Sequence, residues 1–310
     1  MSELAPNLPL ARFRRNRLAV LGAGLLAALL LLVLLWPLAL EVAQRCGPAG
    51  AAFAARYQPD QLSNEQFAPP GWRHWFGTDV HGRELFSRVL FGARISLLVG
   101  IVGAGVSLVI GVLWGAVAGY AGGRVDSFMK RLVDILYSLP SIIFVIVLIT
   151  TLEAIFKQWL GGRAAGTTTR LLFLFVGLGA VSWLTRARIV RGQVLSLRQR
   201  PFVEASRALG ASPLRVLARH IIPNTLGVVI VYVALTVPAI ILYESFLSYL
   251  GLGIEPPMAS WGSLIAEGAE QINPLRIYWW LIIFPGAFLV GTLLALSFVG
   301  DGLRDAWEVR

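Results

Sequence analysis

Apolar runs of about 20 residues with few or no charges recur along the chain and constrain its fold more than any other feature. A helix needs about 20 apolar residues to cross the hydrocarbon core of a bilayer, where its backbone groups must bond to one another. The 310-residue chain is 56% hydrophobic and only 14% charged, whereas a soluble domain carries roughly 25% charged residues. The sequence therefore predicts an all-α, polytopic membrane protein.

Six membrane spans account for these runs. The first follows several arginines, as in a signal peptide, but its 23 uncharged residues exceed the roughly 7–15 of a signal-peptide core, so we expect an uncleaved span. The fourth has only 15 uncharged residues, so it must begin within residues 166–169 or continue past Arg186. Pro140, Pro238 and Pro285 lie inside the third, fifth and sixth spans and are expected to kink them. The spans are expected at Leu18–Leu40, Ile95–Tyr120, Leu132–Leu152, Leu171–Thr185, Leu226–Glu244 and Ile277–Gly300.

The distribution of Lys and Arg favours a cytoplasmic N-terminus and C-terminus, because cytoplasmic loops are enriched in these residues. This orientation places 17 of the 27 Lys and Arg residues on the cytoplasmic side. Residues 1–40 then hold the cytoplasmic N-terminus and first span, 41–94 an extracytoplasmic loop, 95–300 a core of five spans, and 301–310 a cytoplasmic tail. The polar stretch 202–224 between the fourth and fifth spans also becomes cytoplasmic.

Composition and motifs argue against several other functional classes. The net charge of +10 fits basic residues flanking spans better than nucleic-acid binding, because no basic run is interleaved with aromatic residues on a polar domain. A Walker A motif ends in Gly-Lys-Ser/Thr, and neither lysine, Lys130 or Lys157, follows a glycine. The three histidines are scattered and Cys46 is the only cysteine, so we expect no metal site, no internal disulfide and no enzymatic activity.

A stripe of small residues runs along the second predicted span. They recur at every fourth position, which puts them on one helical face and lets a neighbouring backbone approach closely. We interpret the stripe as a helix-packing surface without a direct role in transport. Its members are Gly103, Ser107, Gly111, Gly115 and Gly119.

The stretch 202–224 is predicted to form two short helices. The first, Val203–Leu209, should end at Gly210, because glycine commonly ends helices. Ser212 has the position of an N-cap, with Pro213 at the first helical residue, where its missing N–H costs nothing. The second helix is expected to end at Pro223.

The second of these helices is amphipathic. Leu214, Leu217 and Ile221 are predicted to share one face, while Arg215 and Arg219 share another. We expect this helix–turn–helix element to lie against the membrane with its polar side in the cytoplasm. On physical grounds alone, an interfacial helix that only anchors the loop explains the pattern equally well.

The same stretch resembles the EAA loop of ABC importer permeases. Glu204-Ala205-Ser206 is followed by Gly210 and later by Ile221-Ile222-Pro223-Asn224, with Ser206 where the family usually has alanine. Other segments from Phe76 to the C-terminus resemble the dipeptide/oligopeptide branch, and the Arg-rich start and first span suit its C-type subunit, whereas residues 41–75 show no such resemblance. These segments are Phe76-Gly77-Thr78-Asp79, Gly82-Arg83, Ser87-Arg88, Gly92-Ala93-Arg94-Ile95-Ser96, Ser248-Tyr249-Leu250-Gly251-Leu252-Gly253, Pro256-Pro257, Ser260-Trp261-Gly262 and Gly300-Asp301-Gly302-Leu303-Arg304-Asp305.

This resemblance implies a type I ABC importer permease of the bacterial inner membrane. Its loop would dock as a coupling helix in a groove of an ATPase subunit. The implied partners are a second homologous permease, two ATPase subunits, an extracytoplasmic solute-binding protein and membrane lipid, with ATP and magnesium bound by the ATPases and no cofactor in this chain. The substrate implied is a peptide, with nickel or another small solute as the alternative. The expected coupling residues are Glu204, Ala205, Ser206, Gly210, Leu214 and Leu217.

Ionisable residues inside spans are candidates for a substrate path. Asp134 and Glu244 meet this criterion, although both lie near predicted span ends, where we expect them to reach water. Asp134 is also expected to pair with Arg131. Three aromatic residues at the start of the sixth span are interpreted as anchors at the membrane interface: Tyr278, Trp279 and Trp280.

Two other functions remain open from the sequence. A membrane scaffold could use residues 202–224 to recruit a soluble partner without transport. A secondary transporter would require paired charges at mid-membrane and inverted repeats, and the sequence displays neither.

Overall fold

The computed structural model describes residues 8–159, 167–254 and 256–307. Residues 1–7 and 308–310 of the predicted cytoplasmic ends, and Gly166 at the predicted start of the fourth span, lie outside the described residues. Within those ranges the chain forms helices joined by loops, with isolated backbone bridges only at Thr78–Glu84 and Asn273–Arg276. The predicted all-α class is confirmed.

Five helical stretches of the described chain are long and apolar enough to cross a membrane, and a helix pair bent by 97° makes a sixth if the pair counts as one broken span. The fourth span extends in both directions beyond its 15 uncharged residues, and the sixth begins at Trp280, three residues later than predicted. The spans are α2 (Arg17–Arg45), α4 (Leu85–Ala121), the bent pair α5 (Gly123–Ser138) and α6 (Ser141–Trp159), α7 (Thr167–Leu197), α10 (Ile222–Ala234) with α11 (Thr236–Tyr249), and α13 (Trp280–Trp307).

The third span is not the single kinked helix predicted over Leu132–Leu152. α5 and α6 meet at 97° across a short break at Leu139 and Pro140. Leu139 has an extended backbone, with φ −79° and ψ 139°, because the ring of the following proline disfavours the helical conformation at that position. The backbone therefore turns sharply where a mere kink was expected.

The fifth span is also interrupted. α10 ends and α11 begins on either side of Leu235, three residues before Pro238, whose missing N–H leaves the Ala234 carbonyl without a helical donor. The prediction that Pro223 ends a helix is wrong, because the chain continues through a π-helical turn, η1 (Leu217–Ile221), into α10. In that wider turn the Ile222 N–H donates to the Leu217 carbonyl. Pro223 therefore falls in the first turn of α10, where the missing N–H of a proline is tolerated.

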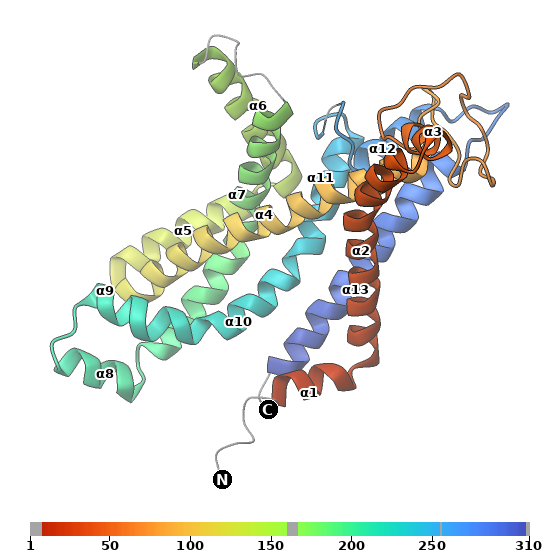
Figure 1. The fold of residues 1–310 in the computed structure, drawn as a ribbon. Coiled ribbons are helices and arrows are strands. Elements are labelled where there is room, and N and C mark those ends of the chain that lie inside the picture. Colours follow the sequence, from red (N-terminus) through yellow and green to blue (C-terminus); the bar gives the residue numbers. More distant parts are fainter. Residues whose placement is uncertain (1–7, 160–166, 255, 308–310) are drawn as a thin grey trace.

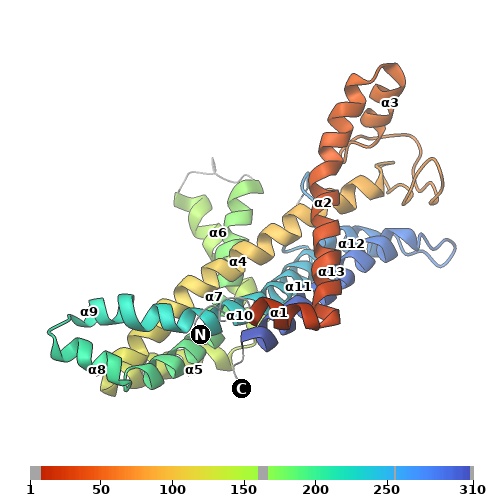
Figure 2. The same cartoon turned by 60° about the horizontal axis from the view of Figure 1, so that its bottom comes forward.

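The helices separate the molecule into two ends. The shorter helices α8 and α9 lie together at one end, whereas α3 and α12 lie at the other, as both views show (Figure 1; Figure 2). α4 runs between them and packs along α7, while α13 crosses α2 (Figure 1). The remaining helices are α1 (Leu8–Arg15), α3 (Pro48–Arg56), α8 (Pro201–Ala208), α9 (Pro213–Val216) and α12 (Trp261–Glu270).

Much of the apolar surface is exposed. Along α2, Leu21, Leu25, Leu31, Leu34 and Leu38 each expose more than half of their surface. A soluble protein rarely exposes so large a contiguous apolar patch. These side chains are suited to contact lipid or another membrane subunit.

Candidate functional site

The small-residue stripe of α4 lies mostly against α7. A Cβ added to Gly111 would lie 2.6 Å from Cβ of Arg186, and one added to Gly115 would lie 2.5 Å from the Ala187 carbonyl oxygen. The stripe continues at Gly119, where an added Cβ would lie 2.9 Å from the Arg191 carbonyl oxygen. Only residues without larger side chains permit this approach, so α4 and α7 form one closely packed unit.

The N-terminal part of the stripe makes additional contacts. A Cβ added to Gly103 would lie 3.1 Å from Cγ2 of Ile240 in α11. Ser107 is fully buried and its hydroxyl accepts a hydrogen bond from Arg186. The stripe thus brings α4 against both α7 and α11.

The stretch 202–224, hereafter the elbow, folds as two helical segments around a sharp turn. α8 is followed by Gly210 at φ +81°, a left-handed conformation that glycine adopts without strain. Ser212 caps α9 by accepting a hydrogen bond from the Arg215 N–H at 3.4 Å. Local sequence signals therefore predicted the turn and the cap correctly.

The buried face of the elbow agrees only in part with the predicted one, because Ile221 is buried and Leu217 packs beside it, whereas Leu214 is exposed. Val203, Val216 and Ile221 are fully buried and join a cluster with Val112 of α4 and Val190 of α7. The packed face is thus centred between Val216 and Ile221 and anchors the elbow on the α4–α7 unit.

Leu214 lies outside this face, because the π-helical turn Leu217–Ile221 rotates Ile221 away from the position that a regular α-helix would give it. It was predicted to share the apolar face but is 76% exposed, and Leu209 is 89% exposed. The other predicted coupling residues Glu204, Ala205 and Gly210 are exposed, while Ser206 and Leu217 are half-buried. Two leucines thus project away from the protein beside a charged surface.

Glu244 does not reach water, contrary to the prediction. Its carboxylate is fully buried and accepts hydrogen bonds from Ser248 at 2.7 Å, Ser96 at 3.3 Å and Ser245 at 3.4 Å. Ser96 in turn accepts a hydrogen bond from the Trp261 N–H. Glu244 therefore joins α11, α4 and α12 rather than facing a path.

Asp134, the other candidate for the path, is half-exposed and pairs with Arg188 of α7 at 2.7 Å rather than with Arg131. The expected partner lies on the same helix, whereas the observed one comes from a neighbouring helix. Arg188 also stacks over the ring of Tyr137, 4.1 Å from its centroid. This surface pair links α5 to α7.

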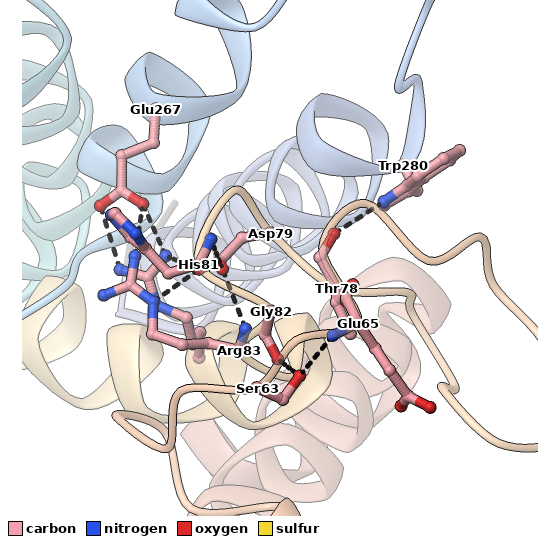
Figure 3. Close-up of polar contacts among 10 residues, drawn as sticks. Ser63, Glu65, Thr78, Asp79, His81, Gly82, Arg83, Glu267 and Trp280 are labelled. Atoms are coloured by element: carbon pink, nitrogen blue, oxygen red, sulfur yellow. Dashed lines mark hydrogen bonds and ion pairs between the residues drawn. The ribbon is translucent and has the colours of Figure 1, made fainter.

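A cluster of charges ties the loop before α4 to α12. The Arg88 side chain is only 3% exposed, and its guanidinium donates to Asp79 at 2.8 Å and to Glu267 at 2.6 and 3.0 Å. Arg83 donates to the same Asp79 carboxylate at 2.7 Å and to Glu267 at 3.3 Å, and Figure 3 shows its side chain reaching Glu267. We call Asp79, Arg83, Arg88 and Glu267 the charge cluster.

The charge cluster escaped the sequence analysis because Glu267 lies 179 residues from Arg88. The resemblance of Phe76-Gly77-Thr78-Asp79, Gly82-Arg83 and Ser87-Arg88 to a family motif included three members of the cluster, but it did not identify Glu267 as their partner.

The aromatic residues expected to anchor at the membrane interface instead hold this same loop. Trp280 is buried and donates to the Thr78 carbonyl at 3.2 Å (Figure 3). Tyr278 stacks on Phe67, with ring centroids 4.1 Å apart. Trp279 is exposed, at 49%, and Tyr278 is half-buried, so the anchor interpretation fails for the buried Trp280.

His74 lies between two carboxylates beside the charge cluster. Its ring nitrogens lie 2.7 Å from Glu84 and 2.9 Å from Glu65. Burial raises the pKa of Glu84, while its hydrogen bond with His74 opposes that rise. One oxygen of the Glu84 carboxylate is buried without a hydrogen-bond partner, which is consistent with the upward direction of its pKa shift.

No group of three or more His, Cys, Asp or Glu side chains able to hold a metal ion occurs in the described part of the chain. The elbow carries exposed apolar side chains, Leu209 and Leu214, on a buried base.

Comparison with known proteins identifies relatives over nearly the whole chain. Residues 111–310 match the family described as binding-protein-dependent transport system inner membrane component. The oligopeptide transport system permease protein of Escherichia coli K12 is 45% identical over 96% of this chain and 89% of that protein. The corresponding protein of Haemophilus influenzae is 43% identical over 96% and 86%, and the dipeptide transport system permease protein of Bacillus subtilis is 40% identical over 96% and 84%.

A solved structure of inward-facing conformations of the MetNI methionine ABC transporter contains a chain of the same fold. The TM-score is 0.53 at 21% sequence identity, covering 73% of this chain and 98% of that chain. The fold, the family match and the relatives agree: the chain belongs to the family of binding-protein-dependent transport system inner membrane components.

Proposed function

We propose that this chain is a permease subunit of an ATP-driven importer that carries peptides across the bacterial inner membrane. Family membership supports the transport role, and the relatives named as oligopeptide and dipeptide permeases support the peptide substrate. A solute-binding protein delivers the peptide, and a second permease subunit completes the path. Two ATPase subunits bind ATP and magnesium and supply the energy, because this chain lacks a Walker A motif.

The observation that carries the proposal is the elbow. Leu209 and Leu214 are exposed, as expected for apolar anchors that enter a groove on a partner. Val203, Val216 and Ile221 fix the same element to α4 and α7. A force applied to the exposed leucines is therefore transmitted to two spans that the small-residue stripe joins.

Transport then follows as alternating access. Closure of the ATPase pair moves the elbow and tilts α4 with α7, which shifts the permease between inward-open and outward-open states. ATP and the loaded binding protein act only through their differential affinity for these states. In the proposed membrane orientation, both termini and the elbow are cytoplasmic. The end of the molecule that holds the charge cluster is then extracytoplasmic, on the side of the binding protein.

A pair of leucine variants tests this function in the purified complex. Leu214→Asp places a charge in the proposed groove, so we expect the ATPases to dissociate and ATP-dependent uptake of a labelled dipeptide into proteoliposomes to fall at least about tenfold. Leu275→Asp is the matched control, because Leu275 is 89% exposed and follows α12 at the other end. It should retain the ATPases. Full ATPase binding and uptake by Leu214→Asp would contradict the coupling role.

A further inference from the structure

A cavity of about 310 Å³ opens between the two broken spans. Tyr137 and Ser141 line it from the α5–α6 break, Leu235 and Thr236 from the α10–α11 break, and Arg186 from α7. Its volume lies at the lower end of the roughly 300–1,000 Å³ typical of ligand pockets. Interrupted helices of transporters commonly line substrate sites, because they expose backbone and polar side chains inside the membrane.

The cavity contains a buried guanidinium. Arg186 is 6% exposed, and its Nη1 donates to the Ser107 hydroxyl and the Ser182 carbonyl. Its Nε is buried without a hydrogen-bond partner. Among the described residues, no carboxylate forms an ion pair with Arg186.

Arg88 shows what a compensated arginine looks like in the same molecule. It is buried to a similar extent, at 3% exposure, but contacts the carboxylates of Asp79 and Glu267. A buried charge without a partner is costly, and an ionisable residue within a span is a functional candidate by default. The contrast between the paired Arg88 and the unpaired Arg186 indicates that Arg186 can bind an anion from outside this chain.

We propose that Arg186 binds the carboxylate of the transported solute in this cavity. The planar fork of a guanidinium matches a carboxylate with two parallel hydrogen bonds. Tyr137, Ser141 and Thr236 line the same cavity, and these hydroxyl-bearing residues are of a type suited to bond the neighbouring polar atoms of the solute. This proposal rests on the proposed function, in which the solute is a peptide with a terminal carboxylate.

The test is uptake of a labelled dipeptide and of its C-terminal amide by proteoliposomes containing the whole complex and its binding protein. We expect the wild-type complex to favour the free acid by about tenfold or more, as for a hydrogen-bonded charge. Arg186→Gln should reduce this ratio toward 1, and Arg186→Lys should give an intermediate ratio because it keeps the charge and loses the fork. The binding protein is the same in every sample, so a changed ratio originates in the permease.

Arg188→Gln is the matched control. It removes a guanidinium two positions away on α7 whose partner is Asp134, and we expect the free-acid to amide ratio to remain at the wild-type value. Assembly of each variant is checked by co-purification of the other subunits.

Each remaining outcome counts against the proposal in a distinct way. Equal uptake of both peptides by the wild-type complex would overturn this inference but not the proposed function. Arg186 variants that retain the wild-type ratio would do the same. Loss of subunit assembly in both Arg186 variants would overturn it by assigning Arg186 to a carboxylate of the second permease. A wild-type complex that takes up neither peptide would overturn the proposed function and this inference together.

Discussion

The two ends of the molecule are held together by different forces. At the α12 end, the charge cluster joins segments 179 residues apart through buried ion pairs. At the elbow end, Val203, Val216 and Ile221 pack against α4 and α7. Breaking a buried ion pair leaves an uncompensated charge, whereas apolar contacts tolerate a change of angle. Under the proposed function, the end held by ion pairs would receive the binding protein, and the elbow would move with α4 and α7.

The largest expected effect is a loss of folding stability when the charge cluster at the α12 end is broken. Arg88→Met removes the guanidinium and leaves Asp79, which is 4% exposed, beside fewer positive charges. We expect a loss of about 3–5 kcal/mol, because one partner of a buried pair is removed. Thermal unfolding of the detergent-purified protein measures it, and an unchanged Tm would show that the cluster does not stabilise this end.

A smaller loss of stability is expected when the contact between α4 and α7, which connects the two ends, is disrupted. Gly115→Ala places a Cβ 2.5 Å from the Ala187 carbonyl oxygen, so α4 and α7 must separate at a cost of about 1–3 kcal/mol. Gly105→Ala is the control on the same helix, because its Cβ would meet no atom within 4 Å. Thermal unfolding should separate the two variants, and equal Tm values would contradict tight packing of the stripe.

At the elbow, Gly210→Val should uncouple transport while leaving membrane insertion intact. The φ of +81° strains a β-branched residue by about 1–3 kcal/mol, and each 1.4 kcal/mol corresponds to about tenfold. We expect at least a tenfold loss of uptake at normal membrane abundance. Gly210→Asn should retain more uptake, because asparagine tolerates the left-handed region. Parallel loss of abundance and uptake in Gly210→Val would argue against coupling.

The α12 end should also respond to pH through Glu84. Because its pKa is raised in the folded protein, its contribution to stability is fully present below the unfolded value and is lost as pH rises through the raised folded value. Glu84→Gln removes this group's titration, so its Tm should fall less than that of the wild type as pH rises above about 4.5. Identical pH profiles would show that Glu84 does not contribute.

The smallest effect is expected for the exposed pair between α5 and α7. The Asp134 and Arg188 side chains are 46% and 43% exposed, and such pairs contribute about 0–1 kcal/mol. Asp134→Asn should therefore change Tm by only a few degrees and leave uptake intact. Abolished uptake with a normal Tm would instead place Asp134 in the substrate path.

Sequence reasoning succeeded where the signal was local. Gly210 and Ser212 act within their own turns, so the helix end and the cap followed directly from residue type. Pro140 was correctly recognised as a disruption, but the 97° bend depends on the extended backbone of Leu139 and on packing. The prediction for Pro223 was wrong because a π-helical turn precedes it and lets the chain continue as a helix despite the missing N–H of the proline.

The remaining features depend on contacts between distant segments. Glu244 appeared to lie at a span end, and only the fold places Ser96 of α4 against it. Likewise, Arg88 and Arg186 are both arginines near apolar stretches, and nothing local indicates that one is paired and the other is not. The family and the elbow were therefore predictable, whereas the charge cluster and the cavity were not.

Crosslinking from the elbow tests the central claim most directly. Cys46, the only cysteine, is replaced by serine, and Leu214→Cys supplies a single reactive thiol in the assembled complex. The account predicts a specific crosslink to an ATPase subunit that reports on bound nucleotide, with labelling only from the cytoplasmic side. A thiol at position 214 that captures no ATPase, or that reacts from the outside of intact cells, would contradict it.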